Sequence, residues 1–302
     1  MIGCAKPSVA LIGPGRLGQA VTALLRQQGY PITAIVGRDR QRTAEAARFI
    51  GAELMATTDI NRCAPADIIL IATTDDQLAT TAAQLCDTVP LGDSTLLVHC
   101  SGLHPAQVLK HSADMPQHVL AMHPLQTFAS GEQGMKSLAG CFFSLEGDSQ
   151  AVEQGQQLVS DLGGESFIIE GQYKARYHAA ACMASNFITT LIDSAGEVLR
   201  PCNPQQDIPL SVLGPLIRTA VENSLTLGPK TALTGPIVRG DDGTVASHLE
   251  QLKRHHPDLV ALYQQLGLQT VDLAQRSNRL SAAKGEKISN ILSQSDDERD
   301  SD

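Results

Sequence analysis

A glycine-rich turn directly after a short apolar run is the feature of this sequence that most restricts its fold. Val9–Ile12 has the composition of a buried strand, and residues 13–18, Gly-Pro-Gly-Arg-Leu-Gly, lead from it into a helical segment. Gly13 would permit the tight turn, Gly15 would let the backbone approach a pyrophosphate, and Gly18 would let the helix pack closely on the strand. The helix N-terminus would then offer free N–H groups to that anion. The turn therefore predicts a dinucleotide site that includes Gly13, Gly15, Arg16, Leu17 and Gly18.

The first half of the chain alternates short apolar runs with helical segments. Strands are expected over residues 9–12, 32–36, 67–72, 95–99, 118–122, 141–145 and 166–169. Helices are expected over residues 16–28, 40–50, 77–86 and 151–162. Repeated strand-then-helix units indicate an α/β fold with a doubly wound, parallel sheet of the Rossmann type.

The second half has a helical pattern. From Tyr177 to residue 198 the apolar residues recur at steps of three and four, which predicts one long helix ending before Pro201. No strand stands out in this half, and the sequence predicts an all-helical C-terminal domain. Further helices are expected over residues 210–227, 257–266 and 271–276. The expected divisions are a dinucleotide-binding domain over residues 1–170, a helical domain over 171–292 and a disordered acidic tail over 293–302.

Composition limits the class of protein. The chain has 302 residues and a formal net charge of −9, which disfavours binding to nucleic acid. No stretch reaches the roughly 20 apolar residues that span a bilayer, and residues 1–8 are too short and polar for a secretory signal. The seven cysteines are scattered without a Cys-x-x-Cys pair, which favours reduced thiols over disulfides or a zinc site. We therefore expect a cytoplasmic protein without a metal, a nucleic-acid partner or a membrane anchor.

Arg38 bears on the choice between NAD and NADP. NAD-binding versions of the glycine turn place an acidic residue about 20 residues downstream, where it binds the ribose hydroxyls. Counted from Gly18, that position is Arg38, and a guanidinium there can pair with a 2′-phosphate. Arg40 and Arg42 add positive charge, whereas a register shift of one residue would bring Asp39 to this position. The sequence favours NADP(H) as the cofactor.

Polar residues follow three of the expected strands. Ligands of doubly wound sheets lie beyond the carboxyl ends of the strands, so these residues are candidates for the cofactor and substrate cleft. His123 would stand at a turn, because Pro124 lacks the N–H that a regular central strand needs. His99 can equally be a structural histidine, and the spacing of His99 and His104 does not favour a metal site. The residues expected near the cofactor are Ala72, Thr73, Thr74, His99 and Ser101.

The start of the long helix carries the candidate catalytic residues. Lys174, His178 and Ser185 are separated by four and seven residues, which places them close to one helix face, with Asn186 on its flank. Reduction of a carbonyl or imine requires a proton donor and a polarising group near the atom that gains negative charge. We expect Lys174 or His178 to be the acid, Asn186 to position the substrate, and Ser185 to contact it.

A segment dense in turn residues spans residues 234–244. It is expected to be a loop between two helical stretches. Arg239 within it is a candidate for binding a substrate carboxylate, and an ordinary exposed loop is the alternative.

Six motifs in this order resemble Rossmann-like proteins with a C-terminal domain of the type called DUF2520. The resemblance runs from about residue 9 to about residue 291 and is carried by residues 13–18, 99–103, 123–128, 177–181, 185–186 and 233–236. This group is similar to the class that includes pyrroline-5-carboxylate reductase, 6-phosphogluconate dehydrogenase and ketopantoate reductase. The resemblance implies an NADP-binding domain followed by a helical domain that dimerises and closes over a small-molecule substrate.

The resemblance also suggests a reaction. Many enzymes of that class carry a Lys followed four residues later by Asn, whereas here Lys174 is followed by His178, and Asn186 comes later. Some relatives are thought to reduce ketopantoate, a 2-oxo acid, to pantoate. This makes NADPH-dependent reduction of a 2-oxo acid the leading expectation. Imine reduction of the pyrroline-5-carboxylate kind and a non-catalytic NADP(H)-binding sensor are the alternatives.

Overall fold

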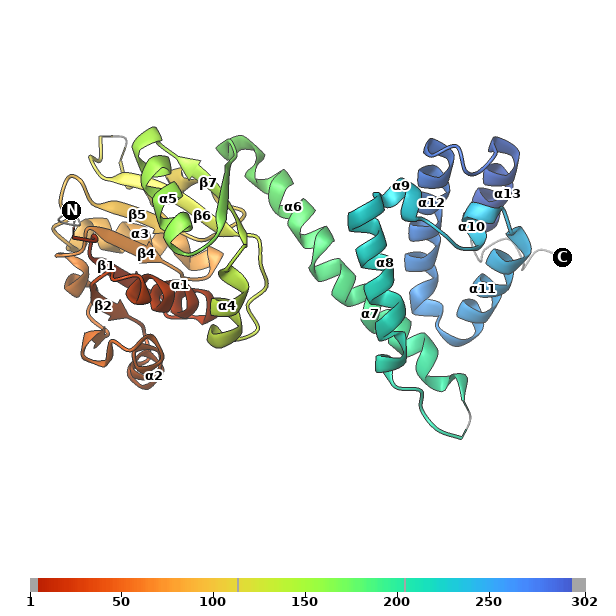
Figure 1. The fold of residues 1–302 in the computed structure, drawn as a ribbon, viewed down its shortest axis with the longest axis horizontal. Coiled ribbons are helices and arrows are strands. Elements are labelled where there is room, and N and C mark those ends of the chain that lie inside the picture. Colours follow the sequence, from red (N-terminus) through yellow and green to blue (C-terminus); the bar gives the residue numbers. More distant parts are fainter. Residues whose placement is uncertain (1–4, 113, 204, 295–302) are drawn as a thin grey trace. The chain divides into compact units, whose positions relative to one another are not determined.

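The computed structural model describes residues 5–112, 114–203 and 205–294, drawn in colour in Figure 1. The chain forms two compact units, of which the first ends at Phe187 and the second begins at Ile188. The change from strands to helices comes earlier, after β8 (Glu165–Ile168), so the helix that follows this strand still belongs to the first unit. The eight terminal residues of the acidic tail, 295–302, lie outside the described residues.

The first unit is built on one eight-stranded sheet in the order β3-β2-β1-β4-β5-β6-β7-β8. Every neighbouring pair is parallel except β6 and β7, which confirms the predicted mostly parallel α/β fold. The chain reverses its order between β1 and β4, which is the switch point where doubly wound sheets bind ligands. The strands are β1 (Val9–Ile12), β2 (Ile32–Val36), β3 (Ala56–Thr57), β4 (Ile68–Ile71), β5 (Leu96–His99), β6 (His118–Pro124), β7 (Phe142–Gly147) and β8.

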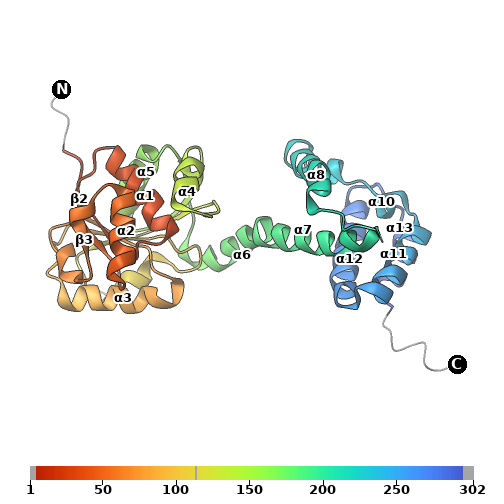
Figure 2. The ribbon, with the colours of Figure 1, turned by 90° about the horizontal axis from the view of Figure 1, so that it is seen from below.

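Helices cover both faces of this sheet because its central strands are apolar on both sides. Along β1, Val9 and Leu11 face one core while Ala10 and Ile12 face the other. The first core is closed by α1, α2, α4 and α5, and the second by α3 and short 3-10 turns, as Figure 2 shows for α3 and α1. The bounds are α1 (Arg16–Gln27), α2 (Arg40–Ile50), α3 (Asp75–Thr88), α4 (Gly131–Leu138), α5 (Ser149–Asp161) and α6 (Lys174–Ala184).

The turn predicted at His123 and Pro124 begins after them, because both residues still belong to β6, which ends at Pro124. β6 pairs with β5 only as far as Ala121, and from there it continues beside β7 alone. Leu125 N donates to Phe142 O, so in this antiparallel pair the nitrogen of Pro124 points away from β7. No ladder hydrogen bond is lost there, and His123 is held inside a strand opposite Ser144.

The single long helix predicted from Tyr177 to residue 200 is interrupted. Ser185 has φ −126° and ψ −74°, outside the helical region, and it separates α6 from α7 (Asn186–Leu199). The periodicity continues through this position because one irregular residue shifts the apolar positions only slightly. Ser185 therefore ends one helix and Asn186 begins the next.

The second unit is helical, as predicted, and has its own core. Val245, Leu249, Val271 and Ile288 are buried together in it. The helices are α7, α8 (Gly214–Leu227), α9 (Pro229–Ala232), α10 (Pro236–Arg239), α11 (Asp242–His255), α12 (Val260–Arg276) and α13 (Ala282–Leu292).

Two expectations for this unit are corrected. Residues 234–244 are not simply a loop, because Pro236–Arg239 forms α10 with Ile237 buried, and α11 begins at Asp242. The two helices expected over 257–266 and 271–276 form one helix, α12, preceded by a 3-10 turn.

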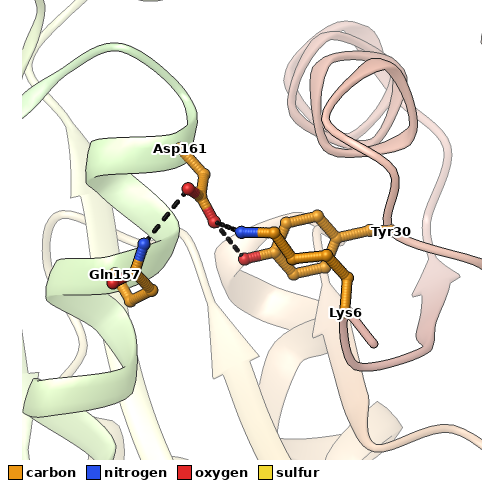
Figure 3. A network of polar contacts seen from close by, with 4 residues as sticks. All are labelled: Lys6, Tyr30, Gln157 and Asp161. Carbon is orange, nitrogen blue, oxygen red and sulfur yellow. Dashed lines mark hydrogen bonds and ion pairs between the residues drawn. The ribbon is translucent and has the colours of Figure 1, made fainter. Parts of the chain in front are cut away.

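A polar network ties the start of the chain to the first unit (Figure 3). The carboxylate of Asp161 at the end of α5 accepts hydrogen bonds from the Lys6 ammonium and the Tyr30 hydroxyl on one oxygen. Gln157 Nε2 donates to its other oxygen at 3.1 Å, and Lys6 Nζ lies 4.9 Å from the centre of the Tyr30 ring. The hydrogen bonds of Asp161 offset its partial burial and lower its pKa. The segment before β1, the connection before β2 and α5 therefore meet at one carboxylate.

Candidate functional site

The glycine turn has the geometry that its sequence predicts. Gly13 has φ +84°, and a Cβ there would lie 2.9 Å from backbone atoms of Ala72 and Thr73. A Cβ on Gly18 would lie 2.9 Å from Gly13 O and 3.0 Å from Leu11 Cδ1. A side chain at either position would separate α1 from the ends of β1 and β4. Only glycine therefore keeps the turn closed.

Gly15 has different surroundings. A Cβ at Gly15 would meet no atom within 4 Å, so its neighbourhood is open rather than crowded. Gly15 is the N-cap of α1, and no side chain caps this helix end. Thr73 Oγ1 is buried at the end of β4 without a hydrogen-bond partner among the described residues. An open helix N-terminus and an unpaired hydroxyl fit the pyrophosphate and ribose groups of a dinucleotide.

The structure distinguishes the roles of Arg38 and Asp39. Asp39 Oδ1 accepts a hydrogen bond of 2.8 Å from Arg42 N, so this carboxylate is the N-cap of α2. Arg38 is exposed just after β2. Hydrogen bonds from Thr74 and Gln77 lower the pKa of Asp76, and the charge of Arg38 contributes to the same shift. Asp39 is therefore occupied as a cap, whereas a contact of Arg38 with the cofactor remains a prediction.

His99 organises the loop that follows β5. Its ring is fully buried; Nδ1 accepts from Ser101 N at 3.0 Å, and Nε2 lies 3.3 Å from Pro105 O, to which it must donate. Burial, followed by the charge of Lys174, lowers the pKa of His99 to about 3, so the ring stays neutral. Ser101 Oγ accepts from the N–H groups of Leu103 and His104. Direct cofactor contacts by His99 and Ser101 remain predictions, and their observed contacts hold the loop in shape.

Lys174 is the most unusual side chain of the site. Only 1% of it is exposed, and its Nζ donates a hydrogen bond of 3.0 Å to Ser101 O. Burial lowers the pKa of Lys174 to about 8, while the charges of Glu146, Cys100 and Asp75 oppose this shift. At neutral pH the ammonium therefore keeps its proton but releases it more readily than an exposed lysine does.

Two further imidazoles meet beside Gly102. A Cβ on Gly102 would lie 2.7 Å from His178 Cδ2 and 2.9 Å from His123 Nε2. The centres of these two rings are 6.1 Å apart. His123 Nδ1 is 2.7 Å from the hydroxyl of Tyr177, and burial lowers the pKa of His123 to about 4. The structure thus brings Lys174, His178 and His123 together around residues 101–102.

Three other predicted residues belong to other elements of the chain. Ser185 and Asn186 fall at the junction of α6 and α7, where Asn186 is exposed. Arg239 belongs to the second unit, at the end of α10, and its carbonyl accepts a hydrogen bond from Lys284 Nζ at 3.2 Å. Their contributions to substrate binding remain predictions.

Three residues of the site were not anticipated. The carboxylate of Glu146 on β7 accepts a hydrogen bond from Ala106 N, and its negative charge favours the protonated form of Lys174. Tyr177 contacts His123 from α6, and Gly102 leaves room for the two imidazoles. The pairing of β6 with β7 brings Glu146 to the site, which no local pattern reveals. Tyr177 was predicted as an apolar position of a helix and as part of the motif at 177–181, without a role in the site.

The described part of the chain offers neither a metal site nor a membrane span. No group of three or more His, Cys, Asp or Glu residues among residues 5–112, 114–203 and 205–294 could hold a metal ion. None of the helices in these ranges is long and apolar enough to cross a membrane.

Two domain families match the sequence. Residues 2–124 match the Rossmann-like domain, and residues 141–270 match DUF2520, a domain of unknown function. The chain combines a Rossmann-like domain with a DUF2520 domain. This confirms the pairing that the motifs suggested. The DUF2520 match includes β7, β8 and α6, so it contributes Glu146, Lys174 and His178 to the cluster.

Solved structures share the fold of this Rossmann–DUF2520 protein. A candidate NADP oxidoreductase, BF3122 from Bacteroides fragilis, is 25% identical with a TM-score of 0.74, over 88% of this chain and 98% of that one. Protein TM1727 from Thermotoga maritima is 23% identical with a TM-score of 0.65, over 89% and 99% of the two chains. A pyrroline-5-carboxylate reductase from Coxiella burnetii is 14% identical with a TM-score of 0.55, over 90% and 98%. A comparison with curated proteins gave no match.

Proposed function

We propose that this protein is an NADP(H)-dependent oxidoreductase that reduces a small carbonyl substrate, with a 2-oxo acid such as ketopantoate as the first candidate. The observation that carries the proposal is the buried ammonium of Lys174, held on Ser101 O beside His123 and His178. This cluster lies beyond the carboxyl ends of β5 and β6, on the same sheet edge as the glycine turn. The charge of Asp75, at the start of α3 after β4, acts on both Lys174 and His123. A cofactor region and a set of proton donors therefore share one edge of one sheet.

The residues that would hold the cofactor are those whose polar groups have no partner among the described residues or are exposed at the carboxyl ends of β1, β2 and β4. The N-terminus of α1 at Gly15 and Arg16 would receive the pyrophosphate, Thr73 would donate to a ribose or phosphate oxygen, and Arg38 would pair with the 2′-phosphate. The similarity to a candidate NADP oxidoreductase supports this choice of cofactor. A bound NADPH would supply the hydride.

The proton and the electrostatic stabilisation would come from this chain. The carbonyl oxygen gains negative charge as it is reduced, and a nearby cation or N–H donor lowers the energy of that charge. Lys174 carries a proton at neutral pH and is the preferred donor, with His178 as the alternative. His123, which stays neutral, would polarise the oxygen through its Nε2–H group.

A substrate panel tests the proposed reaction. We expect the purified protein to oxidise NADPH with 2-oxo acids faster than with cyclic imines, followed at the nicotinamide absorbance. Lys174→Ala should lower kcat by about 10²- to 10⁴-fold, because a positioned acid contributes that much. Full activity in both Lys174→Ala and His178→Ala would contradict the catalytic assignment. Tight NADPH binding without turnover of any substrate would favour the sensor alternative.

The pH dependence tests Lys174 as the acid. The folded pKa of Lys174 is about 8, so the acid is present below this pH and is lost as the pH rises through it. We expect kcat/KM to fall about tenfold per pH unit above 8. His99 and His123, with pKa values of about 3 and 4, do not change charge between pH 6 and 10. A profile that stays flat to pH 10 would exclude Lys174 as the donor.

Arg38 tests the cofactor preference. Arg38→Ala should raise the Kd of NADPH by about 10- to 100-fold, because a charge-assisted pair with the 2′-phosphate is lost, and should leave that of NADH nearly unchanged. The matched control is Arg48→Ala, which removes an arginine from the last turn of α2, the helix that follows Arg38. Equal losses for the two nucleotides, measured by fluorescence titration, would contradict a 2′-phosphate contact.

We also propose that the protein is a homodimer through the helices of its second unit. None of the residues of α8 is buried, and α7 buries only Gly196. Large apolar side chains on α8 are exposed, including Leu216 at 68% and Leu225 at 79%. Together with those of α7 they expose on the order of several hundred Å², the size of a protein–protein interface rather than of a monomer surface. A second copy is the occupant that the family resemblance implies.

Sedimentation measures this interface. We expect the wild type to sediment as a dimer. Leu225→Glu should raise the dissociation constant of the dimer by at least about tenfold, because a carboxylate would be buried in an apolar contact. Leu54→Glu is the control, since Leu54 is 91% exposed in the first unit. A monomeric wild type, or an unchanged Leu225→Glu dimer, would contradict the proposal.

A further inference from the structure

We propose that Tyr177 is a positioning residue that fixes His123 in the form protonated on Nε2 and aims that N–H beside Gly102. The inference rests on the proposed function for its consequence in turnover. Its structural part concerns the resting protein and is measured without substrate.

The contact between the two side chains is short and well fixed. The Tyr177 hydroxyl lies 2.7 Å from His123 Nδ1, although the residues are 54 positions apart in sequence. Their ring planes are almost perpendicular, at 88°, and Phe167 of β8 packs against the other side of the tyrosine with ring centres 6.1 Å apart. His123 itself is held in β6 opposite Ser144. Neither ring can turn away without disturbing the sheet or α6.

The chemistry of the pair sets the direction of the hydrogen bond. Burial lowers the pKa of His123 to about 4 and raises the pKa of Tyr177, so both groups are neutral at pH 7. A phenol releases its proton more readily than a neutral imidazole N–H, and an imidazole nitrogen accepts better than a phenol oxygen. The hydroxyl therefore donates to Nδ1. The remaining imidazole proton must then be on Nε2.

Ser144 supports this direction. Its side chain is fully buried, and its hydroxyl has no hydrogen-bond partner within good geometry among the described residues. It nevertheless lies near enough to Tyr177 to offset part of the rise in the pKa of that phenol. A proton given by this serine to the phenol oxygen would leave the phenol proton for Nδ1, so that tyrosine accepts from serine and donates to histidine.

Nε2 of His123 lies beside Gly102 and His178. It is 2.9 Å from the position that a Cβ of Gly102 would take, so the imidazole packs directly against this glycine. His99 provides the contrast within the same cluster: its Nδ1 also accepts, but its Nε2 donates to Pro105 O. The hydrogen bond of His123 to Tyr177 uses Nδ1, which leaves the Nε2–H group of His123 for another acceptor.

Nitrogen-15 NMR of the histidine rings tests the assignment in the resting protein. We expect His123 of the wild type to show a single neutral tautomer with the proton on Nε2, and Tyr177→Phe to show a mixture of both tautomers. Tyr263→Phe is the matched control, because it removes an equivalent bond, 2.8 Å from the Tyr263 hydroxyl to His248 Nδ1, in the second unit. That control should leave the His123 signals unchanged. A wild-type His123 protonated on Nδ1, or one unchanged tautomer in Tyr177→Phe, would overturn the proposal.

Kinetics supplies the second measurement. Tyr177→Phe should lower kcat about tenfold, while the KM of the substrate and the Kd of NADPH stay within about twofold. The reason is that the residues proposed to bind the substrate and NADPH are unchanged, and only the orientation and protonation of the His123 ring are altered. Tyr263→Phe should retain the wild-type kcat. Equal losses of kcat in both variants would show a general effect on folding and overturn the positioning role. If no substrate is turned over by the wild type but the tautomer changes as expected, the proposed function fails while the role of Tyr177 stands.

Discussion

The hydrogen bond from Lys174 to the carbonyl of Ser101 is the interaction on which the arrangement of the site depends. An ammonium removed from water loses several kcal/mol of hydration and must recover it from nearby dipoles and charges. Here the carbonyl of Ser101 provides a dipole and Glu146 an opposite charge. The loop that carries Ser101 is in turn held by His99 and by the Ser101 hydroxyl. The start of α6 and the end of β5 are thereby fixed to each other.

The direction of β7 brings further polar residues to this region. β7 runs antiparallel to β6, so the first residues of β7, rather than its last, lie beside the carboxyl end of β6. His123 and Glu146 are brought to the same region by this one pairing, and Ser144 is placed directly across from His123. If β7 were parallel to β6, its last residues would lie beside the carboxyl end of β6 instead. The reversed strand therefore adds a second set of polar groups to an edge that already binds ligands in doubly wound sheets.

The parts of the fold that the sequence predicted are those fixed by local patterns. Val9–Ile12 and the glycines after it specify a strand, a turn and a helix within ten residues, and each glycine has the surroundings expected for it. The extension of β6 through Pro124 was missed because it depends on where β5 stops, so that Pro124 lies beside β7 alone. The break at Ser185 was missed because apolar periodicity survives one non-helical residue. Tyr177 and Glu146 belong to the site through contacts between distant segments, which no window of sequence contains.

The N-cap of α2 sets a condition on any redesign of the cofactor preference. An exchange toward NAD places a free carboxylate at the end of β2, and Asp39 is the adjacent acidic residue. Its carboxylate is already bonded to Arg42 N, and releasing it would cost about 1 kcal/mol of helix stability. A new aspartate in place of Arg38 would then put two carboxylates next to each other, one bound to the helix and one to the ribose. Asp39 can therefore keep its place as the cap of α2 only if the carboxylate for a ribose comes from position 38.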